Sequence, residues 1–311
     1  MAQKRMNKRQ QRLERQRRIK KKRRKRLAII LIEIIILTGL GVVAYGMFVM
    51  DKMDTTILNK DKLEVYKDTG DYTNIALFGL DSRDGKLDGG VQSDCIMICS
   101  IDNKTNEIKL VSVYRDTLLK VTQEKYGKAN SAYNIGGPTE AIALLNRNLD
   151  MDIEKYISVN FNALADVVDA LGGIDIDMTE EEVYWTNGYS VETSEVVGRE
   201  TKDLSGAGVH TLDGVQAVSY ARIRYTEGMD FKRTQRQRIV LEKIAEKAQK
   251  ANVVTLNNIV NKVMPQISTN LTTANMLGLA AHATDYTLGE MSGFPFEVTT
   301  CEKVKNHKGS Y

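Results

Sequence analysis

Residues 94–113 read DCIMICSIDNKTNEIKLVSV. Two apolar runs, at residues 94–101 and 107–113, flank the polar segment DNKTN, whose composition is that of a hairpin turn. A third apolar run, NIALFGL at residues 74–80, precedes them and is typical of a buried strand. These three runs predict neighbouring strands at the start of a folded domain.

Helical and extended patterns alternate along the rest of the chain. Residues 180–209 show no clear period and predict a long polar excursion, as a lid or rim. Strands alternating with helices predict one α/β (α+β) domain over residues 74–311, with a central mixed sheet flanked by helices. The further helices are expected at residues 138–149, 162–173 and from Asp230 onward, more weakly near 254–264 and 273–286, and the further strands at 156–161 and 174–178.

The N-terminus combines a basic tail with a long apolar segment. Residues 1–26 contain fifteen Lys or Arg and one acidic residue, whereas residues 27–50 carry only one charge, Glu33. About 20 apolar residues span a bilayer as a helix, and the apolar part of a signal peptide is shorter. Basic residues stay in the cytoplasm, so we expect a single-pass protein of the cell membrane, with residues 51–73 as an outer stalk and the main domain extracytoplasmic.

The charge distribution separates the tail from the body of the chain. The whole chain has a formal net charge of +4 and residues 1–26 carry +14, so the remaining 285 residues carry −10. A general nucleic-acid binder shows a basic face, which an acidic body does not predict. Beside a membrane span, the basic tail is expected to contact anionic headgroups. A soluble nucleic-acid binder stays a rival only if the span is misread.

Several common catalytic classes are excluded by missing motifs. The sequence has no Walker loop, GxSxG, HExxH or Rossmann GxGxxG, and its three histidines have no metal-ligand spacing. Cys95 and Cys99 lie four residues apart on a predicted strand, about 13 Å at strand rise, which is too far for a disulfide. Core packing is therefore the expected role of both cysteines.

Charged side chains stand at the ends of the three predicted strands. Asp81 directly follows the first strand and Asp94 begins the second, so the two carboxylates meet if these strands are antiparallel neighbours. Oxygen ligands of this kind suit Mg²⁺. Arg115 leaves the third strand at the same end, and with Arg83 it can share this rim. The alternatives are an ordinary polar loop and a local ion pair of Arg115 with Asp116, worth little at a surface.

Residues 222–238 read RIRYTEGMDFKRTQRQR and hold a local excess of positive charge. The six cations are Arg222, Arg224, Lys232, Arg233, Arg236 and Arg238. An extended segment at residues 221–225 would point Arg222 and Arg224 the same way and Ile223 toward the core. In the following helix, Arg233 and Gln237 would share one face.

Converging guanidinium groups require a compact, multiply charged anion. Arginine forks match phosphate oxygens better than lysine does, and a helix N-terminus with Asp230 as its N-cap adds donors. Solvent exposure is the alternative for Lys232 and Arg236. These residues predict a phosphate site.

The chain resembles the LytR–CpsA–Psr family of membrane-anchored proteins from bacteria with peptidoglycan walls, from about Asn74 to Lys250. The resemblance rests on GLDSRDG, QSDCIMICSI, VSVYRDT, KANSAYNIGGP, FNALADVVDALGGIDIDM, GVHTLDGVQAVSYARIRY and DFKRTQRQR, in that order. The chain departs from the family at Gln92, where Arg is frequent, and at Tyr114, where Pro is frequent. It also stops at Tyr311, where the family usually continues with another strand and helix, which leaves a truncation open.

The resemblance implies a Mg²⁺-dependent phosphotransferase that moves a glycopolymer from a polyprenyl-pyrophosphate carrier to a peptidoglycan acceptor. It implies Mg²⁺ ligands at Asp81 and Asp94 and catalytic roles for Asp230 and Arg115. The pyrophosphate would be held by Arg83, Arg115, Arg222, Arg224, Arg233 and Gln237. Lys128 and Asn130 are possible rim residues. A non-enzymatic regulator that binds the lipid pyrophosphate and a polyprenyl-pyrophosphate phosphatase remain alternatives.

The family resemblance also implies an apolar interior that accommodates a prenyl tail. The segments IALL (142–145) and VVDAL (167–171) supply apolar faces for it. Ordinary core packing explains both segments equally well.

Overall fold

The structure is a computed structural model that divides into two units, Met1–Phe48 and Val49–Tyr311, and the fold described below is that of the second unit. The described residues are 44–48, 51–52, 54–66, 69–82, 87, 90–226, 229–298, 303–304 and 307–308. Within them, no helix is long and apolar enough to cross a membrane. The predicted span at residues 27–50 lies outside the described part, apart from residues 44–48.

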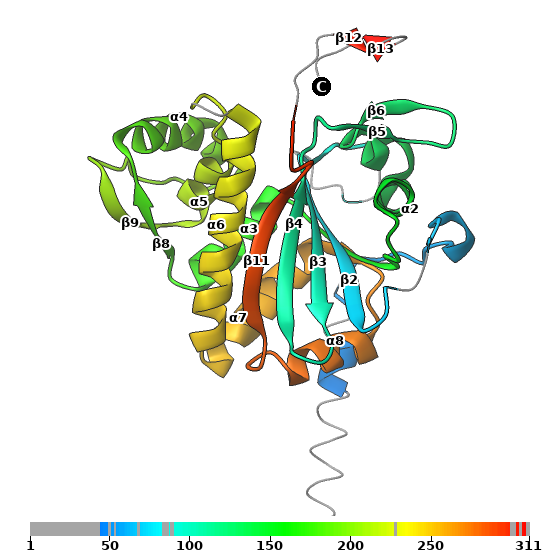
Figure 1. Ribbon diagram of the computed structural model, residues 1–311. Coiled ribbons are helices and arrows are strands. Elements are labelled where there is room, and N and C mark those ends of the chain that lie inside the picture. Colours follow the sequence, from blue (N-terminus) through cyan, green and yellow to red (C-terminus); the bar gives the residue numbers. More distant parts are fainter. Residues whose placement is uncertain are drawn as a thin grey trace, which may run out of the picture. The chain divides into compact units, whose positions relative to one another are not determined.

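A mixed sheet of seven strands, in the order β1-β10-β7-β2-β3-β4-β11, organises the domain (Figure 1). Strand β3 is antiparallel to both β2 and β4, whereas β7 and β11 add in parallel to β2 and β4. The predicted run of three neighbouring strands and the mixed sheet are confirmed. The strands are β1 (Asp54–Thr55), β2 (Tyr72–Leu80), β3 (Ser93–Asp102), β4 (Glu107–Val113), β7 (Lys155–Val159), β10 (Ile267–Thr269) and β11 (Thr287–Phe294).

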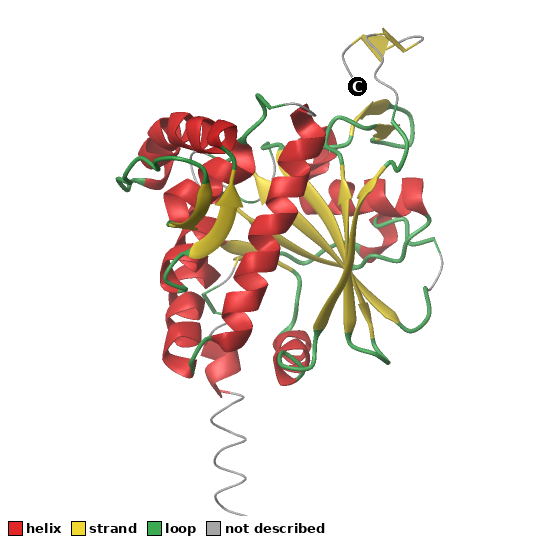
Figure 2. Ribbon diagram, turned by 60° about the vertical axis from the view of Figure 1, so that its left-hand side comes forward, coloured by secondary structure: helices red, strands yellow, loops and turns green. Residues whose placement is uncertain are grey.

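Helices cover both faces of this sheet, as Figures 1 and 2 show. Helix α2 lies against one face, and α3, α5 and α6 lie against the other. The α-helices are α2 (Ser131–Leu149), α3 (Phe161–Ala170), α4 (Glu180–Val197), α5 (Gly214–Arg222), α6 (Met229–Lys250), α7 (Val253–Val263) and α8 (Thr273–Ala281). The small elements are η1 (Lys60–Lys62), β5 (Leu118–Lys120), β6 (Tyr126–Lys128), β8 (Ile174–Met178), β9 (Gly208–Leu212), η2 (Met264–Gln266), β12 (Lys303–Val304) and β13 (His307–Lys308).

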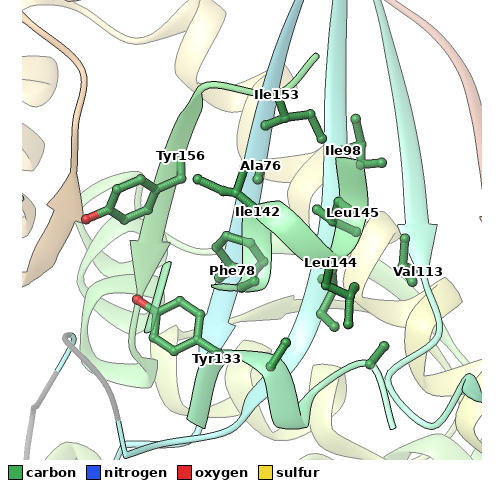
Figure 3. Packing of buried hydrophobic residues seen from close by; sticks show 14 of the residues in the cluster. Ala76, Phe78, Ile98, Val113, Tyr133, Ile142, Leu144, Leu145, Ile153 and Tyr156 are labelled. Atoms are coloured by element: carbon green, nitrogen blue, oxygen red, sulfur yellow. The ribbon is translucent and has the colours of Figure 1, made fainter. Parts of the chain in front are cut away.

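The larger hydrophobic core fills the space between the sheet and α2 (Figure 3). Phe78 of β2 meets Tyr133 of α2 edge to face, with ring centroids 5.3 Å apart. The Tyr133 hydroxyl is buried, and it lies 2.7 Å from the carbonyl of Leu87 and 2.9 Å from Ser158 Oγ. Because side chains alternate along a strand, the remaining residues of β2 and β3 face α3, α5 and α6.

Helix α4 replaces the polar excursion predicted at residues 180–209. A capping box starts it: Glu182 N donates to Thr179 Oγ1, and the Glu182 carboxylate accepts from the backbone of Thr179. Its buried face includes the small polar residues Thr186, Ser190 and Thr193, so the apolar periodicity of an ordinary core helix is missing. The prediction was wrong for this reason, although the T-x-x-E pattern marks the start of the helix.

Several predicted boundaries also move. Strand β7 ends at Val159, because Asn160 accepts a hydrogen bond from Ala163 N and caps α3. Helix α2 begins at Ser131, and the predicted start near Pro138 is a kink at Gly136 and Gly137. Among the described residues, strand β8 pairs only with β9, in a separate two-stranded sheet.

Part of the predicted stalk packs against the domain. Leu58 and Leu63 are buried in the larger core, and β1 pairs with β10 at one edge of the sheet. Glu64 accepts two hydrogen bonds from Arg147 of α2, at 2.6 and 2.7 Å. The folded region therefore includes residues before position 74.

Candidate active site

A β-bulge places Asp94 at the end of the sheet. Gly79 opposes Cys95 and Leu80 opposes Ser93, so Asp94 has no partner residue on β2. Bulges of this kind re-aim side chains and are frequent beside functional sites. A Cβ atom on Gly79 would lie 2.8 Å from Cβ of Cys95, so the close approach of the two strands requires glycine. The antiparallel pairing on which the sequence prediction depended is confirmed.

Three arginines from separate elements converge on Asp94. Arg115, just after β4, donates from Nη1 to Oδ1 at 2.7 Å, and Arg224, just after α5, donates from Nη2 to Oδ2 at 2.8 Å. Arg233 of α6 donates to the backbone carbonyl of Asp94 at 3.2 Å. The side chain of Arg233 is 2% exposed and that of Arg115 is 15% exposed, whereas Arg224 reaches solvent at 42%. The predicted convergence of guanidinium groups is therefore present. Arg83 lies outside the described residues.

The charges of this cluster stabilise one another. Burial alone would raise the pKa of Asp94, but the charges of Arg115 and Arg233, together with the hydrogen bond from Arg115, lower it below its ordinary value. Burial likewise opposes the charge of Arg115, whereas Asp94 raises its pKa. Asp94 is therefore a stable carboxylate that holds cations in place when no other anion is bound.

Asp230 behaves differently from Asp94. It lies inside the first turn of α6, which begins at Met229, and so is not the predicted N-cap. Oδ1 lies 2.9 Å from Arg233 Nη2 and 3.4 Å from Arg115 Nε, but neither carboxylate oxygen accepts a well-aligned hydrogen bond from a described residue. Burial raises the pKa of Asp230 despite these two cations, and the charge of Asp116 adds to the increase. A carboxyl with a raised pKa inside a cation cluster is suited to accept a proton.

A polar cavity of about 230 Å³, here called the mouth cavity, adjoins this cluster: Asp94, Arg224 and Arg233 line it, whereas Arg115 and Asp230 lie behind them and do not. It is lined by Asp81, Asp94, Phe161, Tyr189, Glu192, Ala221, Arg222, Arg224, Arg233 and Gln237. The two predicted metal ligands thus share one cavity wall, and Arg233 and Gln237 share a helix face as predicted. Asp81 Oδ1 is buried without a hydrogen-bond partner among the described residues, so it is an acceptor available to a cation. Within the described ranges, no group of three or more His, Cys, Asp or Glu could hold a metal ion.

Arg222 reaches the mouth cavity from a helix and not from the predicted extended segment. A capping box at Asp213 starts α5, which continues through Arg222, and Ile223 follows as a buried C-cap. Arg222 donates to Glu192 at 2.9 Å, and its guanidinium lies over the rings of Phe161 and Tyr189 at 5.0 and 5.6 Å. These contacts fix the guanidinium at the cavity wall.

An apolar cavity of about 260 Å³ adjoins the mouth cavity on the sheet face opposite α2. The two cavities share the wall residues Asp94, Phe161, Ala221, Arg222 and Gln237. The apolar lining includes Leu77, Met97, Ile157, Leu164, Val218, Val240 and Leu241. Of the two segments that the resemblance suggested for a prenyl tail, IALL at 142–145 packs in the core on the other face, and α3 contributes Phe161 and Leu164 in place of VVDAL.

The rim residues flank the arginine cluster: the backbone N–H of Asn130 donates to the carbonyl of Arg115 at 3.1 Å, whereas Lys128 reaches Arg115 only through Asp116. Lys128 Nζ lies 2.8 Å from Asp116, which is itself 3.5 Å from Arg115 Nε. Asn130 donates to the side chain of Gln92 at 3.2 Å. Both residues support the site from outside, and neither lines the mouth cavity.

Two wall residues, Tyr189 and Glu192, are absent from the predicted site. Both belong to α4, which the sequence pattern did not reveal. Their spacing of three residues would place them on one helix face, so the capping box at Thr179 is the signal that could have found them.

Arg236 has a structural role, so solvent exposure was the wrong alternative for it. It is buried and donates to Glu182 of α4 at 2.9 Å and to Thr226 at 2.9 Å. Lys232 is exposed and contacts only Gln235 in the described structure, at 3.3 Å. Arg236 therefore ties α6 to α4 and to the segment that carries Arg224.

We expect Arg236→Ala to destabilise the domain by about 3 kcal/mol, because it leaves Glu182 without its buried partner. The Lys232→Ala variant on the same helix is the matched control and should change stability by less than about 0.5 kcal/mol. Urea unfolding followed by circular dichroism measures both. Equal effects of the two substitutions would contradict the assigned role.

The sequence profile of the LytR_cpsA_psr family matches residues 41–309. The chain belongs to this family, which confirms the resemblance in the sequence. It is 29% identical over 261 residues to the polyisoprenyl-teichoic acid–peptidoglycan teichoic acid transferase TagU of Enterococcus faecalis, covering 80% of this chain and 79% of the relative. It is 31% identical over 265 residues to the transferase of the same name from Bacillus subtilis, covering 81% and 80%.

Solved structures share the fold. One is described as the LytR-CPS2A-psr family protein YwtF (TagT) with bound octaprenyl pyrophosphate lipid. It superposes with a TM-score of 0.59 at 20% identity, over 82% of this chain and 91% of that chain. At this identity the match establishes the domain architecture, in agreement with the predicted mixed sheet and flanking helices.

Proposed function

We propose that this chain is a transferase that moves a glycopolymer from a polyprenyl-pyrophosphate carrier to peptidoglycan during cell-wall assembly. One observation carries the proposal: a cluster of arginines at a polar mouth opens onto an apolar cavity. A pyrophosphate joined to an isoprenoid chain has these two chemical parts in this order. The names of the two relatives describe the same reaction class, for teichoic acid as the transferred polymer.

The arginines would bind the pyrophosphate by exchange. In the free site Asp94 neutralises Arg115 and Arg224. Incoming phosphate oxygens offer the same guanidinium groups charge-assisted bidentate hydrogen bonds. Arg222 and Gln237 border both cavities and would contact the phosphate at the entrance to the apolar part.

Transfer needs a nucleophile, a base and a stabilised leaving group. A sugar hydroxyl of peptidoglycan would attack the phosphorus that carries the glycan, forming a phosphodiester as the bond to polyprenyl phosphate breaks. Asp230 would take the hydroxyl proton, since its raised pKa favours protonation. Arg115 and Arg233 would stabilise the negative charge that develops on the leaving polyprenyl phosphate.

The donor set also fits Mg²⁺. Asp81 and Asp94 border one cavity, and Asp81 Oδ1 is a buried acceptor without a described partner. In sites of this kind Mg²⁺ is bound by one or two carboxylates together with substrate phosphates. Bound there, it would neutralise charge on the pyrophosphate oxygens.

A reconstituted reaction tests the proposal and separates it from its alternatives. The full chain in detergent is given polyprenyl-pyrophosphate-linked glycan, peptidoglycan and Mg²⁺. A new phosphodiester between glycan and peptidoglycan supports transfer. Release of phosphate without transfer would show a phosphatase, and binding without turnover would show a regulator; either result would overturn the proposal.

We also propose that residues 27–50 anchor the chain in the cell membrane, with the domain outside and the basic tail in the cytoplasm. The 24-residue apolar segment directly after the basic tail supports this arrangement. Protease added to intact protoplasts should digest the domain and spare the tail. Recovery of the chain in the soluble fraction after lysis would refute membrane anchoring.

The apolar cavity provides a separate prediction. Val218 is buried and lines it, so Val218→Phe should narrow the cavity without removing a charge. We expect binding of a long-chain polyprenyl pyrophosphate to weaken at least about tenfold, whereas geranyl pyrophosphate binds nearly as before. Calorimetric titration measures both affinities. Equal loss for the two ligands would show that this cavity does not hold the tail.

A further inference from the structure

A row of four aromatic side chains starts at the wall of the mouth cavity. The rings of Tyr189 and Tyr225 are stacked, with centroids 6.3 Å apart and planes at 27°. Trp185 follows at 5.0 Å from Tyr225, and Tyr184 ends the row at 5.2 Å from Trp185. Three of these residues lie on α4, and Tyr225 lies in the segment that also carries Arg224.

This row combines exposure with rigidity. Tyr184 and Tyr225 are 69% and 67% exposed, which leaves large ring surfaces in water. Trp185 and Tyr189 are partly buried and pack against a second, smaller core, to which α3, α4, α5, α6, β8 and β9 contribute. Exposed aromatic surface held on a rigid support marks a binding surface, because a purely structural role would bury the rings.

A polar cavity is lined by residues close in sequence to the row. Thr226, which follows Tyr225, and Glu181, which precedes Tyr184 by three residues, line a polar cavity of about 390 Å³. Lys232 and Gln235 of α6 complete its exposed wall. These groups can donate and accept hydrogen bonds, as the hydroxyl groups of a sugar require.

We propose that this aromatic row binds the first sugar residues of the donor glycan, those bonded directly to the pyrophosphate. The inference rests on the proposed function. Tyr189, Glu192 and Arg224 line the mouth cavity but not the apolar cavity, so they mark the side away from the isoprenoid tail. A sugar bonded to pyrophosphate in the mouth must leave on this side, where Tyr189 begins the row.

The chemistry of the rings fits a pyranose. The axial C–H bonds of a pyranose form an apolar face with slight positive charge, which is attracted to the negative face of an aromatic ring. The polar cavity lined by Thr226 and Glu181 would supply hydrogen-bond partners for hydroxyl groups of the glycan. Stacking of this kind is specific for the shape of the sugar face and not for a net charge.

The only tryptophan of the chain, Trp185, provides a direct optical reporter. The full chain is titrated with geranyl pyrophosphate and, separately, with N-acetylglucosamine joined through pyrophosphate to geranyl. We expect the sugar-bearing ligand to bind more tightly and to change the Trp185 emission, whereas geranyl pyrophosphate leaves that emission nearly unchanged. Tyr225→Ala should weaken the sugar-bearing ligand about five- to tenfold, as loss of one stacking contact implies. It should not alter the affinity for geranyl pyrophosphate, and Tyr225→Phe should retain the sugar preference.

Controls make each outcome decisive. Tyr66→Ala removes an equally exposed tyrosine, at 66%, outside the row and should change neither affinity.

If the sugar adds nothing to the affinity and the Trp185 emission does not change, the aromatic row is not a donor-glycan site. The proposed function survives that result if Arg224→Ala still weakens geranyl pyrophosphate. If Tyr225→Ala weakens a soluble peptidoglycan fragment and not the donor analogue, the row serves the acceptor and our assignment is wrong. If neither pyrophosphate ligand binds, the proposed function and this inference both fail.

Discussion

The Arg222→Ala, Arg224→Ala double variant is expected to transfer glycan at least about 10³-fold more slowly than the wild-type chain. Each side chain reaches the mouth cavity with a guanidinium group. Removing one preorganised donor to developing charge commonly costs about 10²–10³ in rate, so two such losses should nearly abolish transfer. Incorporation of radiolabelled glycan into peptidoglycan measures the rate.

The same double variant should remain folded. Arg222 pairs with Glu192, which is 41% exposed and can return to water, and Asp94 keeps its contact with Arg115 when Arg224 is lost. Each pair has one half-exposed side chain, Glu192 or Arg224, so its loss should cost less than that of a fully buried pair. Arg238→Ala is the matched control. Arg238 lies on α6, donates to the carbonyl of Ser292 in β11 and lines neither cavity. Normal transfer by the double variant, or equal loss in the control, would refute the assignment of these arginines.

Asp230→Asn is expected to reduce transfer by about 10²–10⁴-fold and at the same time to stabilise the fold at neutral pH. The rate should fall because an amide cannot accept the hydroxyl proton that a general base removes. The stability should rise because burial disfavours the ionised form of Asp230 more than Arg233 and Arg115 favour it. An asparagine mimics the protonated form of Asp230, the form that the raised pKa shows the fold to favour.

The pH dependence follows from the direction of the pKa shift. Burial raises the folded-state pKa of Asp230 above its ordinary value of 3.8. Its contribution to stability is therefore fully present below about pH 3.8 and is lost as the pH rises through the folded-state pKa. Asp94 has a pKa below its ordinary value of 3.8. Its contribution to stability is therefore present above pH 3.8 and is lost as the pH falls through the folded-state pKa. Asp230→Asn should thus raise the unfolding midpoint at neutral pH and have little effect below pH 3.8.

Urea unfolding at two pH values, beside the transfer assay, measures both effects. Glu242→Gln on the same helix is the control, since Glu242 lines neither cavity and its neutralisation should change stability by less than about 0.5 kcal/mol. A stabilised variant that transfers normally would remove Asp230 from the mechanism. A variant that is destabilised at neutral pH would contradict the electrostatic argument.

The sequence alone predicted those helices and strands whose apolar residues recur in a simple pattern. The apolar runs of β2, β3 and β4 predicted neighbouring strands, because a strand buried on both faces must be apolar throughout. The charged residues at the ends of these runs predicted the shared rim of Asp81, Asp94 and Arg115, since antiparallel pairing brings those ends together. The pattern of 222–238 likewise predicted that arginines converge, although it did not reveal that Arg222 ends a helix.

The tertiary structure alone decided which cations serve the site and what surrounds it. Arg233 and Arg236 lie three residues apart on α6, yet Arg233 reaches Asp94 and Arg236 reaches Glu182, because different elements pack against the two sides of the helix. The buried face of α4 includes small polar residues, so no period marks it, and Tyr189 and Glu192 joined the site only through packing. Sequence periodicity reports which face of an element is apolar. Which partner covers that face depends on contacts between residues far apart in the chain, and these contacts exist only in the folded domain.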